Sequence, residues 1–574
     1  MPTLFSLIFR QKINILTLAV ALMCVGSLPG RAAERIHGLD AEKVEITMES
    51  SLVDMVPQRG VAVHNFRVVN HMNKAGRWKV IFSVSEGWNN EKKIQSVREV
   101  EVDAQSAKTV SWEIPVFPNT EFGDYDRKKI EVKVSGPGSG GQQQTLLYSS
   151  PNHYSSNKRV TLVGFSPELR VNRDHWEYDE ILEQLDNSAS TIYISALDFA
   201  AMPSDVSGLS GLDVLVMTLE EWQALSVSQA MIRRWVAGGG QVLLISEKTV
   251  PREMIGAGRI MGMNYLSPFE FIARLQNMST IDQTLAHEKA YDRQVWELAE
   301  AIPEISKSFG GIMLIVILMA GLLGPLNLWV SFRKKNTLQV IWTTPLLSLG
   351  LSLLVGLVIV LSDGFGGKGQ RAVTVLLVPE LDVEVLVQEQ VSRTGVLLND
   401  QFSLPEGTEL YAVASDGDRS DRALRYRQLE NGGWEGSWFE NRSIQAQVLR
   451  RTRSNRSEVI FKRGAEPSVL STVDATFTRL LIRDEKGGWW MVEDLAPGVE
   501  KALLKVNPQL AAKILDEQNP RKTLLFPGKD FQEKQGWFYA DSVQPDRYIE
   551  TLSSVRWQDR AVVYMGPVTM EAGL

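Results

Sequence analysis

Two long uncharged stretches interrupt the alternation of apolar and polar positions along the chain. Residues 309–332 and 337–361 contain no charged side chain, and the basic run between them is Arg333, Lys334 and Lys335. A helix of about 24 residues is roughly 36 Å long, enough to cross the roughly 30 Å of hydrocarbon in a bilayer. The pattern therefore predicts transmembrane helices over 309–332 and 337–361, with the lipid bilayer as a partner.

The basic run predicts how these helices are oriented. Short loops rich in Lys and Arg remain in the cytoplasm, so the loop 333–336 is predicted to be cytoplasmic. Trp329 and Trp342 flank this loop, at the depth where interfacial aromatic residues are expected. Both large parts of the protein, before and after the hairpin, are then predicted to be extracytoplasmic.

The first residues have the pattern of a secretory signal peptide, predicted over 1–32. Arg10 and Lys12 precede a long uncharged run, and small residues follow, with cleavage expected after Ala32. An uncleaved anchor is the alternative. A lipoprotein signal through Cys24 is disfavoured because a methionine stands where a small residue is expected. The predicted location is the bacterial cytoplasmic (inner) membrane, with both large domains periplasmic.

Strand-like alternation with period two dominates residues 33–150. The stretches RWKVIFSVS and KKIEVKVSG are typical of half-buried strands, and turn residues separate such runs. This pattern predicts a β-sandwich of the immunoglobulin-like type. The segment GPGSGGQQQ, residues 136–144, is predicted to be a linker or a loose hairpin tip.

Residues 151–300 alternate continuous apolar runs with helical segments, which predicts a parallel sheet covered on both faces. The expected strands are 159–165, 191–197, 212–218 and 241–246. The carboxyl ends of parallel strands form a natural crevice. The polar residues at these ends, predicted to form a ligand-binding rim, are Ser166, Asp198, Thr218 and Ser246. The alternative is that such residues cap helices or end strands.

The stretch LDVLVMTLEEW, followed by a helix and RRWVAGGGQVLLIS, resembles the class I glutamine amidotransferase-like fold. Versions of this fold occur in bacterial membrane proteins that also carry a transmembrane hairpin. The resemblance implies a cysteine nucleophile after the strand matching QVLLIS, but Ser246 and Glu247 stand there, and no GxSxG motif replaces it. The domain is therefore predicted to be degenerate, with no catalytic residue. His175 is a base by residue type only, and its alternative is a surface histidine beside Trp176.

Strands are also predicted to dominate residues 370–574, in one or two β-sandwich modules. A helical period over 497–517 is interrupted by Pro508, and DEKGG at 484–488 is typical of a hairpin turn. From Phe309 onward the chain resembles hairpin-anchored bacterial envelope proteins, through LAPGVEKAL and the turn GPLNLWVSFRKK. That resemblance implies no established activity.

Two further segments allow competing interpretations. VLRRTRSNR, residues 448–456, carries four arginines; it is either an anion or headgroup contact or, as favoured here, a solvated hairpin edge. Gly238 to Gly240 follow a helix and precede a strand, the reverse of a phosphate-binding loop, which predicts a helix C-cap.

Composition narrows the functions further. The chain has 574 residues, which predicts three or four domains, and its net charge of -7 does not indicate a nucleic-acid partner. The single Cys24 excludes an intramolecular disulfide and a cysteine-based zinc site. The six histidines form no HExxH motif, so neither a metal site nor a cofactor is predicted.

Together these features predict a multidomain α+β membrane protein: an N-terminal β-sandwich, an α/β domain, two transmembrane helices and a C-terminal β-rich domain. The favoured function is a non-catalytic, membrane-anchored envelope protein whose extracytoplasmic domains bind a partner protein or an envelope polymer. One alternative is an accessory subunit of a membrane transport or assembly complex. The other is a hydrolase that uses the α/β crevice.

Overall fold

The computed structural model places most of the chain. It describes residues 34–35, 39–40, 42–53, 57, 60–86, 92–116, 129–139, 143–146, 161–171, 181, 192–199, 202–203, 205–226, 228–248, 250–263, 268–276, 317, 319–333, 339–413, 424–518, 534–542 and 547–571. The predicted signal peptide 1–32 lies outside the described residues, as do His175 and Trp176.

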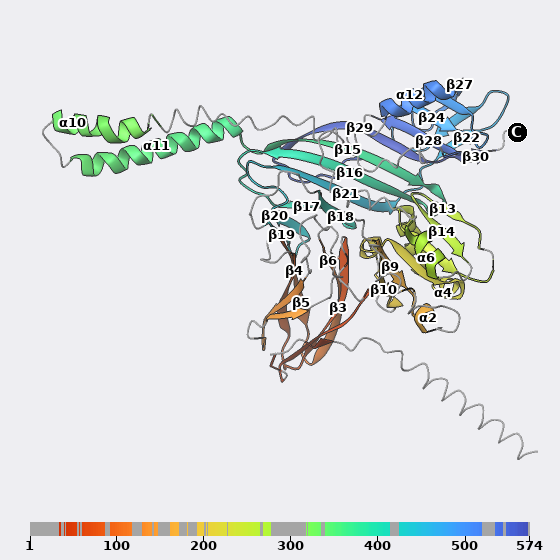
Figure 1. The fold of residues 1–574 in the computed structure, drawn as a ribbon, viewed down its shortest axis with the longest axis horizontal. Helices are drawn as coiled ribbons and strands as arrows, with labels where there is room; N and C mark the ends of the chain where they lie inside the picture. Colours follow the sequence, from red (N-terminus) through yellow and green to blue (C-terminus); the bar gives the residue numbers. More distant parts are fainter. Residues whose placement is uncertain are drawn as a thin grey trace, which may run out of the picture.

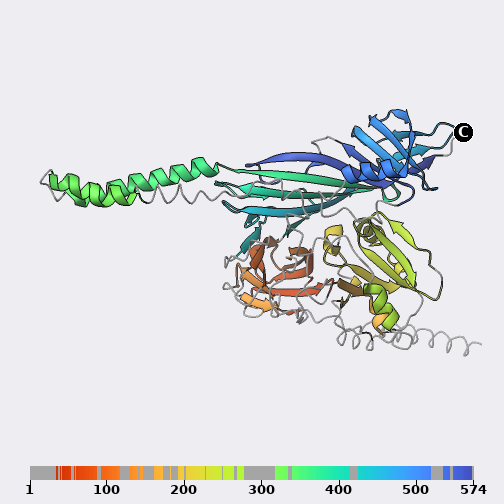
Figure 2. The ribbon, with the colours of Figure 1, turned by 45° about the horizontal axis from the view of Figure 1, so that its top comes forward.

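The protein is multidomain and β-rich, with five sheets among the described residues (Figure 1). A long nine-stranded sheet runs across the molecule. The N-terminal sandwich and the α/β domain lie side by side along it, and a helical hairpin projects from one end (Figure 2).

The N-terminal sandwich begins with a four-stranded sheet in the order β1-β2-β3-β6. Its strands are β1 (Glu34–Arg35), β2 (Val44–Ser51), β3 (Val61–Asn70) and β6 (Ser106–Pro115). The alternation predicted for RWKVIFSVS is confirmed in the facing sheet, because Trp78, Val80, Phe82 and Val84 are all at most 2% exposed.

The facing sheet takes strands from both sides of the helical hairpin. Its order is β17-β20-β19-β5-β4-β7-β8, and β19 pairs in parallel with β5. From the first half come β4 (Gly76–Glu86), β5 (Lys92–Val102), β7 (Lys129–Ser135) and β8 (Gln143–Leu146). From the second half come β17 (Phe402–Ser403), β19 (Leu424–Gln428) and β20 (Gly433–Gly436). The sandwich therefore extends beyond the predicted region 33–150.

The α/β domain contains the predicted parallel sheet, in the order β10-β9-β11-β12-β14-β13, with β13 alone antiparallel. Its strands are β9 (Thr161–Phe165), β10 (Ile192–Ala196), β11 (Val214–Thr218), β12 (Gln241–Ile245), β13 (Glu253–Ile255) and β14 (Gly258–Met263). Every residue of β9, β11 and β12 is buried, which is why these strands read as continuous apolar runs.

Short helices cover this sheet: α2 (Pro167–Val171), the 3₁₀ turn η2 (Val206–Leu209), α4 (Leu219–Ala224), α5 (Ser228–Ala237) and α6 (Pro268–Gln276). The glycines after α5 form the predicted C-terminal turn. The Gly239 N–H donates to Val236, and Gly239 has a φ of 118°. A Cβ at Gly240 would lie 2.3 Å from the Trp235 ring, so only glycine fits there.

The C-terminal half builds the nine-stranded sheet, in the order β18-β21-β16-β15-β29-β28-β24-β25-β27. Its strands are β15 (Gly367–Val378), β16 (Val383–Thr394), β18 (Thr408–Val413), β21 (Ile444–Ser454), β24 (Phe477–Arg483), β25 (Trp489–Leu495), β27 (Leu504–Val506), β28 (Trp537–Ser542) and β29 (Val555–Pro567). A four-stranded sheet packs against it, with β22 (Val459–Lys462), β23 (Ser468–Ser471), β26 (Glu500–Ala502) and β30 (Thr569–Glu571).

Three local predictions in this half have different outcomes. The turn at 484–488 is confirmed, since the Asp484 carboxylate accepts from the Gly488 N–H at 2.7 Å. The helix over 497–517 is wrong in its first part, which forms β26 and β27. Pro508 begins α12 (Pro508–Gln518) rather than breaking it, because the first turn of a helix does not use that N–H. Asn507 caps the helix by accepting from the Leu510 N–H at 2.7 Å.

The arginine-rich strand is not a solvated hairpin edge, so that prediction is wrong. β21 pairs with β16 on one side and with β18 on the other. Arg450 is 6% exposed and its Nη2 lies 2.6 Å from the Glu409 carboxylate. The strand is thus interior to the sheet, and carboxylates pair with Arg450 and Arg453.

The helical hairpin consists of the π-helical turn η4 (Leu322–Leu326), α10 (Asn327–Arg333) and α11 (Gln339–Asp363). Asn327 joins its two arms, donating to Thr344 and accepting from Thr343, each at 2.9 Å. No helix among the described residues has both the length and the apolar character that a membrane crossing needs. The predicted spans 309–332 and 337–361 are thus not confirmed, and residues 309–316, Lys334 and Lys335 lie outside the described residues.

Candidate functional site

The four predicted rim residues lie at one edge of the parallel sheet, where the carboxyl ends of its strands meet. Ser166, Thr218 and Ser246 end or follow the neighbouring strands β9, β11 and β12, and they are 0%, 5% and 6% exposed. Asp198 follows the outermost strand β10, and its N–H donates to the Leu52 carbonyl of the sandwich at 3.0 Å. The sequence pattern thus placed these residues at strand ends, as parallel pairing requires.

The hydroxyls at this edge have mostly local partners. Thr218 forms a capping box with Glu221: its Oγ1 accepts from the Glu221 N–H at 3.1 Å, and the Glu221 carboxylate accepts from the Thr218 N–H. Ser246 Oγ accepts from the Lys248 N–H at 3.0 Å. Ser166 Oγ is buried without a hydrogen-bond partner among the described residues. Ligand binding at this rim stays a prediction.

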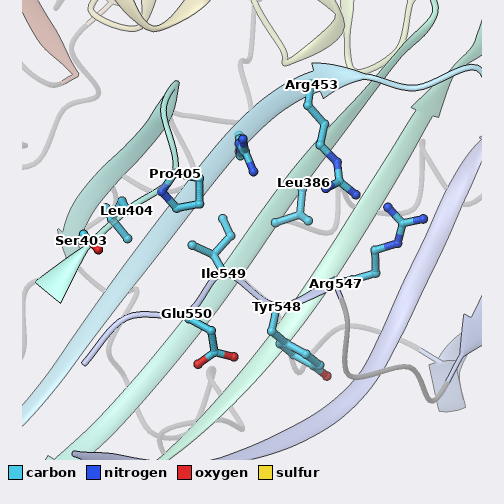
Figure 3. A pocket seen from close by; sticks show the side chains of 10 residues that line it. Leu386, Ser403, Leu404, Pro405, Arg453, Arg547, Tyr548, Ile549 and Glu550 are labelled. Atoms are coloured by element: carbon cyan, nitrogen blue, oxygen red, sulfur yellow. The ribbon is translucent and has the colours of Figure 1, made fainter. Parts of the chain in front are cut away.

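A cavity with a strongly basic lining lies on the nine-stranded sheet (Figure 3). Its volume is about 510 Å³, within the usual range for small-molecule sites. The lining residues come from β16, β17, β21 and the segment before β29: Leu386, Ser403, Leu404, Pro405, Arg451, Arg453, Arg547, Tyr548, Ile549 and Glu550. We call this the arginine cavity.

A buried carboxylate holds two of the three cavity arginines. Glu384 is 0% exposed, and its side chain accepts from Arg453 Nε, from Asn455 and, at 3.2 Å, from Arg547 Nη1. Figure 3 shows Arg453 and Arg547 reaching toward each other over the sheet. A buried charge needs this kind of pairing, because an unpaired carboxylate in the interior is costly.

Buried glutamines fix the wall that carries Tyr548 and Ile549. Gln388 donates to the Ile549 carbonyl at 2.8 Å and accepts from the Ile549 N–H at 2.7 Å, as a backbone strand would. Gln390 continues the network, accepting from Gln388 at 2.9 Å and donating to Gln447 at 2.8 Å. All three glutamines are at most 1% exposed. The wall is therefore held by a network of buried, hydrogen-bonded glutamines.

The cavity carries more positive than negative charge. Arg453 and Arg547 share one carboxylate, and no described residue forms an ion pair or side-chain hydrogen bond with Arg451. Glu550 lies at the edge, 72% exposed, and is engaged by Arg371 at 3.0 Å. Arg371 also stacks over Tyr548, 4.4 Å from the ring centre. The sequence singled out the arginines of 448–456, but Arg547 lies far away along the chain and carried no local signal.

A second charged junction joins three regions of the molecule. Glu113 of β6 accepts from Ser207 Oγ of η2 at 2.7 Å, and the negative charges of Asp205 and Glu409 lie nearby. Burial raises the pKa of the Glu113 carboxyl to about 7, and the neighbouring carboxylates add to this effect. This buried carboxyl lies where the sandwich, the α/β domain and the nine-stranded sheet meet.

No protein-family model matches the chain, and no curated protein sequence matches it. Among solved structures, a cycloisomaltooligosaccharide glucanotransferase from Paenibacillus sp. is 11% identical, with 34% of this chain and 27% of that chain covered and a TM-score of 0.16. A β-glucuronidase from Bacteroides uniformis is 10% identical, with 35% and 33% covered and a TM-score of 0.17.

A glycosyl hydrolase family 2 member from Bacteroides cellulosilyticus is 7% identical, with 90% of this chain and 78% of that chain covered and a TM-score of 0.19. The chain spans about a third or less of the first solved structures it matches, 27% and 33% of their lengths. These are distant similarities to multidomain β-rich glycoside hydrolase folds. At such TM-scores they carry no argument about the function of this protein.

Proposed function

We propose that this protein is a non-catalytic, membrane-anchored envelope protein whose extracytoplasmic domains bind a partner protein or an envelope polymer. The helical hairpin is the membrane anchor in this proposal, with Arg333 on the cytoplasmic side. The degenerate amidotransferase-like character of the α/β domain is part of the proposal, because Ser246 and Glu247 stand where the resemblance implies a cysteine.

The observation that carries the proposal is the apolar surface of the hairpin. Large apolar side chains on both arms are exposed: Trp329 58%, Phe332 65%, Ile341 65%, Trp342 81%, Leu346 75%, Leu349 62% and Leu353 68%. Large apolar side chains exposed together on one hairpin are typical of contact with a membrane or a protein. Arg333 lies over the Trp329 ring at 5.3 Å, a basic and aromatic pair suited to the interface between lipid and water.

Strand pairing adds an independent argument about topology. β5 precedes the hairpin and β19 follows it, yet the two strands pair directly from Leu424 with Lys92 to Gln428 with Ser96. The parts of the chain on the two sides of the hairpin must therefore lie on the same side of any membrane. An anchor that crosses twice satisfies this requirement, whereas one that crosses once does not.

Topology reporters test the anchor. We expect a periplasmic reporter to be active when fused after Leu574, and a cytoplasmic reporter to be active when inserted at Lys335. Protease added to spheroplasts is expected to cut the large domains. A fully soluble full-length protein after mild lysis, or a cytoplasmic signal at the C-terminus, would refute the anchor.

Crosslinking followed by purification in mild detergent tests the binding role. We expect a stable envelope partner, or an envelope polymer, to be captured through the sandwich or the α/β domain. Recovery of a complex with an ATPase and multi-span subunits would favour the accessory-subunit alternative. Activity of the purified protein on ester or amide substrates, abolished by Ser246→Ala, would favour the hydrolase alternative.

A further inference from the structure

We propose that the arginine cavity binds the phosphate group of a small, soluble phosphate ester. This site lies on the nine-stranded sheet, away from the rim of the α/β domain, and its occupation does not require the membrane anchor. The proposal therefore goes beyond the binding of a protein or polymer partner.

The charge of the cavity selects an oxyanion. The Arg451 guanidinium has no ion-pair or hydrogen-bond partner among the described residues, so its planar fork of donors is available. Arg453 and Arg547 share the single buried carboxylate of Glu384. Each of these two guanidinium groups therefore keeps further N–H donors for a ligand. Planar guanidinium groups bind phosphate through paired hydrogen bonds, which favours this ligand over a neutral one.

Contacts within the protein hold the groups that line the cavity. Gln388 accepts from the Ile549 N–H at 2.7 Å and donates to the Ile549 carbonyl at 2.8 Å, and Glu384 orients Arg453 and Arg547. Because these groups are fixed by the fold, binding costs little ordering of the site.

The remaining lining accommodates an organic body attached to the phosphate. Leu386, Leu404, Pro405 and Ile549 supply apolar surface, and Ser403 supplies a hydroxyl. At about 510 Å³ the cavity has room for more than inorganic phosphate alone. A phosphate ester whose body carries both hydroxyl groups and carbon surface matches this lining.

The position of the cavity favours a soluble ligand over a lipid headgroup. β15 begins at Gly367, just after the hairpin, whereas the cavity residue Leu386 pairs with Val375. At about 3.4 Å per residue, the cavity lies roughly 27 Å along the sheet from the strand end that adjoins the hairpin. A headgroup in the membrane that holds the hairpin would have to leave the bilayer to reach it.

Calorimetry on the full-length protein in mild detergent tests this inference. The probes are inorganic phosphate, glycerol 3-phosphate and glucose 6-phosphate, with glycerol and glucose as controls that lack the phosphate. We expect at least one ester to bind more tightly than inorganic phosphate, with affinity falling as salt increases. Arg451→Gln should weaken this binding about 10- to 100-fold, the usual effect of losing a charge-assisted hydrogen bond.

Arg456→Gln is the matched control, because Arg456 is 88% exposed, pairs with Asp382 at 3.7 Å and does not line the cavity. It should change the affinity less than twofold. No binding by any phosphate ester, or equal losses in the two variants, would overturn the proposal. Binding to phosphatidylglycerol vesicles without binding to the soluble esters would show that the ligand is a lipid headgroup, and it would overturn the proposal of a soluble ligand.

Arginine-specific modification of the unaltered protein provides a measurement that does not depend on a variant folding. Phenylglyoxal labelling followed by mass spectrometry should show that the bound ester protects Arg451 and leaves Arg456 reactive. Equal labelling of Arg451 with and without the ester would also overturn the proposal.

Discussion

The α/β sheet and the sheet that completes the N-terminal sandwich use the chain in opposite ways. All six strands of the α/β sheet come from one stretch, from Thr161 to Met263. The seven-stranded sheet of the sandwich instead combines β4, β5, β7 and β8 with β17, β19 and β20, which follow the hairpin. The first sheet is assembled from neighbours in sequence, and the second depends on two distant parts of the chain meeting.

The difference appears in the side chains of the two cores. Phe402, Tyr426, Trp434 and Trp438 from the second half pack in one core with Trp78 and Phe82 from the first. Arg98 of β5 also donates to Gln428 Oε1 of β19 at 2.9 Å. The sandwich therefore cannot be complete until residues beyond the hairpin have been added, and the closure of so long a loop is expected to slow its formation.

The largest effect is expected for Trp438→Ala. Trp438 is 2% exposed and stacks edge to face with Tyr426 at 4.6 Å and Trp434 at 5.4 Å. Removing it should cost about 3–5 kcal/mol of unfolding free energy. Hydrogen exchange should show lost protection in β4 and β5, although the substitution lies in the other half of the chain.

Phe165→Ala in the α/β core is the matched control for that experiment, since Phe165 is 0% exposed. Its loss of protection should concentrate in β9, β10 and β11. The comparison between the two sheets fails if Trp438→Ala leaves β4 and β5 as well protected as before.

Gln388→Ala sharpens the comparison by testing a contact within the second half alone. The Ile549 N–H and carbonyl both lose their partner, which should cost on the order of 2–3 kcal/mol. Hydrogen exchange at residues 547–551 should rise, while the strands of the α/β sheet keep their protection. Faster exchange throughout β9, β11 and β12 would show that this network is not local to the nine-stranded sheet.

Glu113→Gln tests the junction where the sandwich and the α/β domain meet. The folded pKa of about 7 lies above the ordinary value of 4.5, because burial disfavours the charged form. Between these pH values the unfolded chain releases the proton while the folded protein keeps it, so the wild-type protein loses stability as pH rises.

The glutamine of the variant does not ionise, so it stays neutral at every pH. The variant should match the wild type near pH 4.5 and exceed its stability by on the order of 1–2 kcal/mol at pH 8. Denaturant unfolding across this range measures the difference. Glu101→Gln is the control, because Glu101 is 62% exposed and pairs with Arg77. A constant difference between Glu113→Gln and wild type at every pH would contradict the assignment.

The smallest effect is expected for Asn327→Val in the hairpin. This change removes two side-chain hydrogen bonds to Thr343 and Thr344. Interhelical hydrogen bonds of this kind contribute about 0.6 kcal/mol on average in a membrane. Thermal unfolding in mild detergent should shift slightly, and both compared sheets should keep their hydrogen-exchange protection. A large loss of protection in the sandwich would show that the hairpin sets its assembly.

Local sequence patterns were sufficient wherever neighbours in sequence are neighbours in space. The apolar runs of β9, β11 and β12, the glycine turn after α5 and the turn at Asp484 follow from periodicity and turn chemistry. Pro508 misled the helix prediction because proline both breaks a helix interior and favours a first turn, and only the strands β26 and β27 before it separate these cases.

The sequence by itself determined the parallel sheet, the two uncharged arms of the hairpin and the candidate rim at Ser166, Thr218 and Ser246, because these depend on spacing within short segments. The tertiary structure decided that β19 joins β5 and that Arg547 meets Arg453 around Glu384. Hydrogen bonding between distant strands and pairing of buried charges depend on the path of the whole chain. No window of neighbouring residues contains that information.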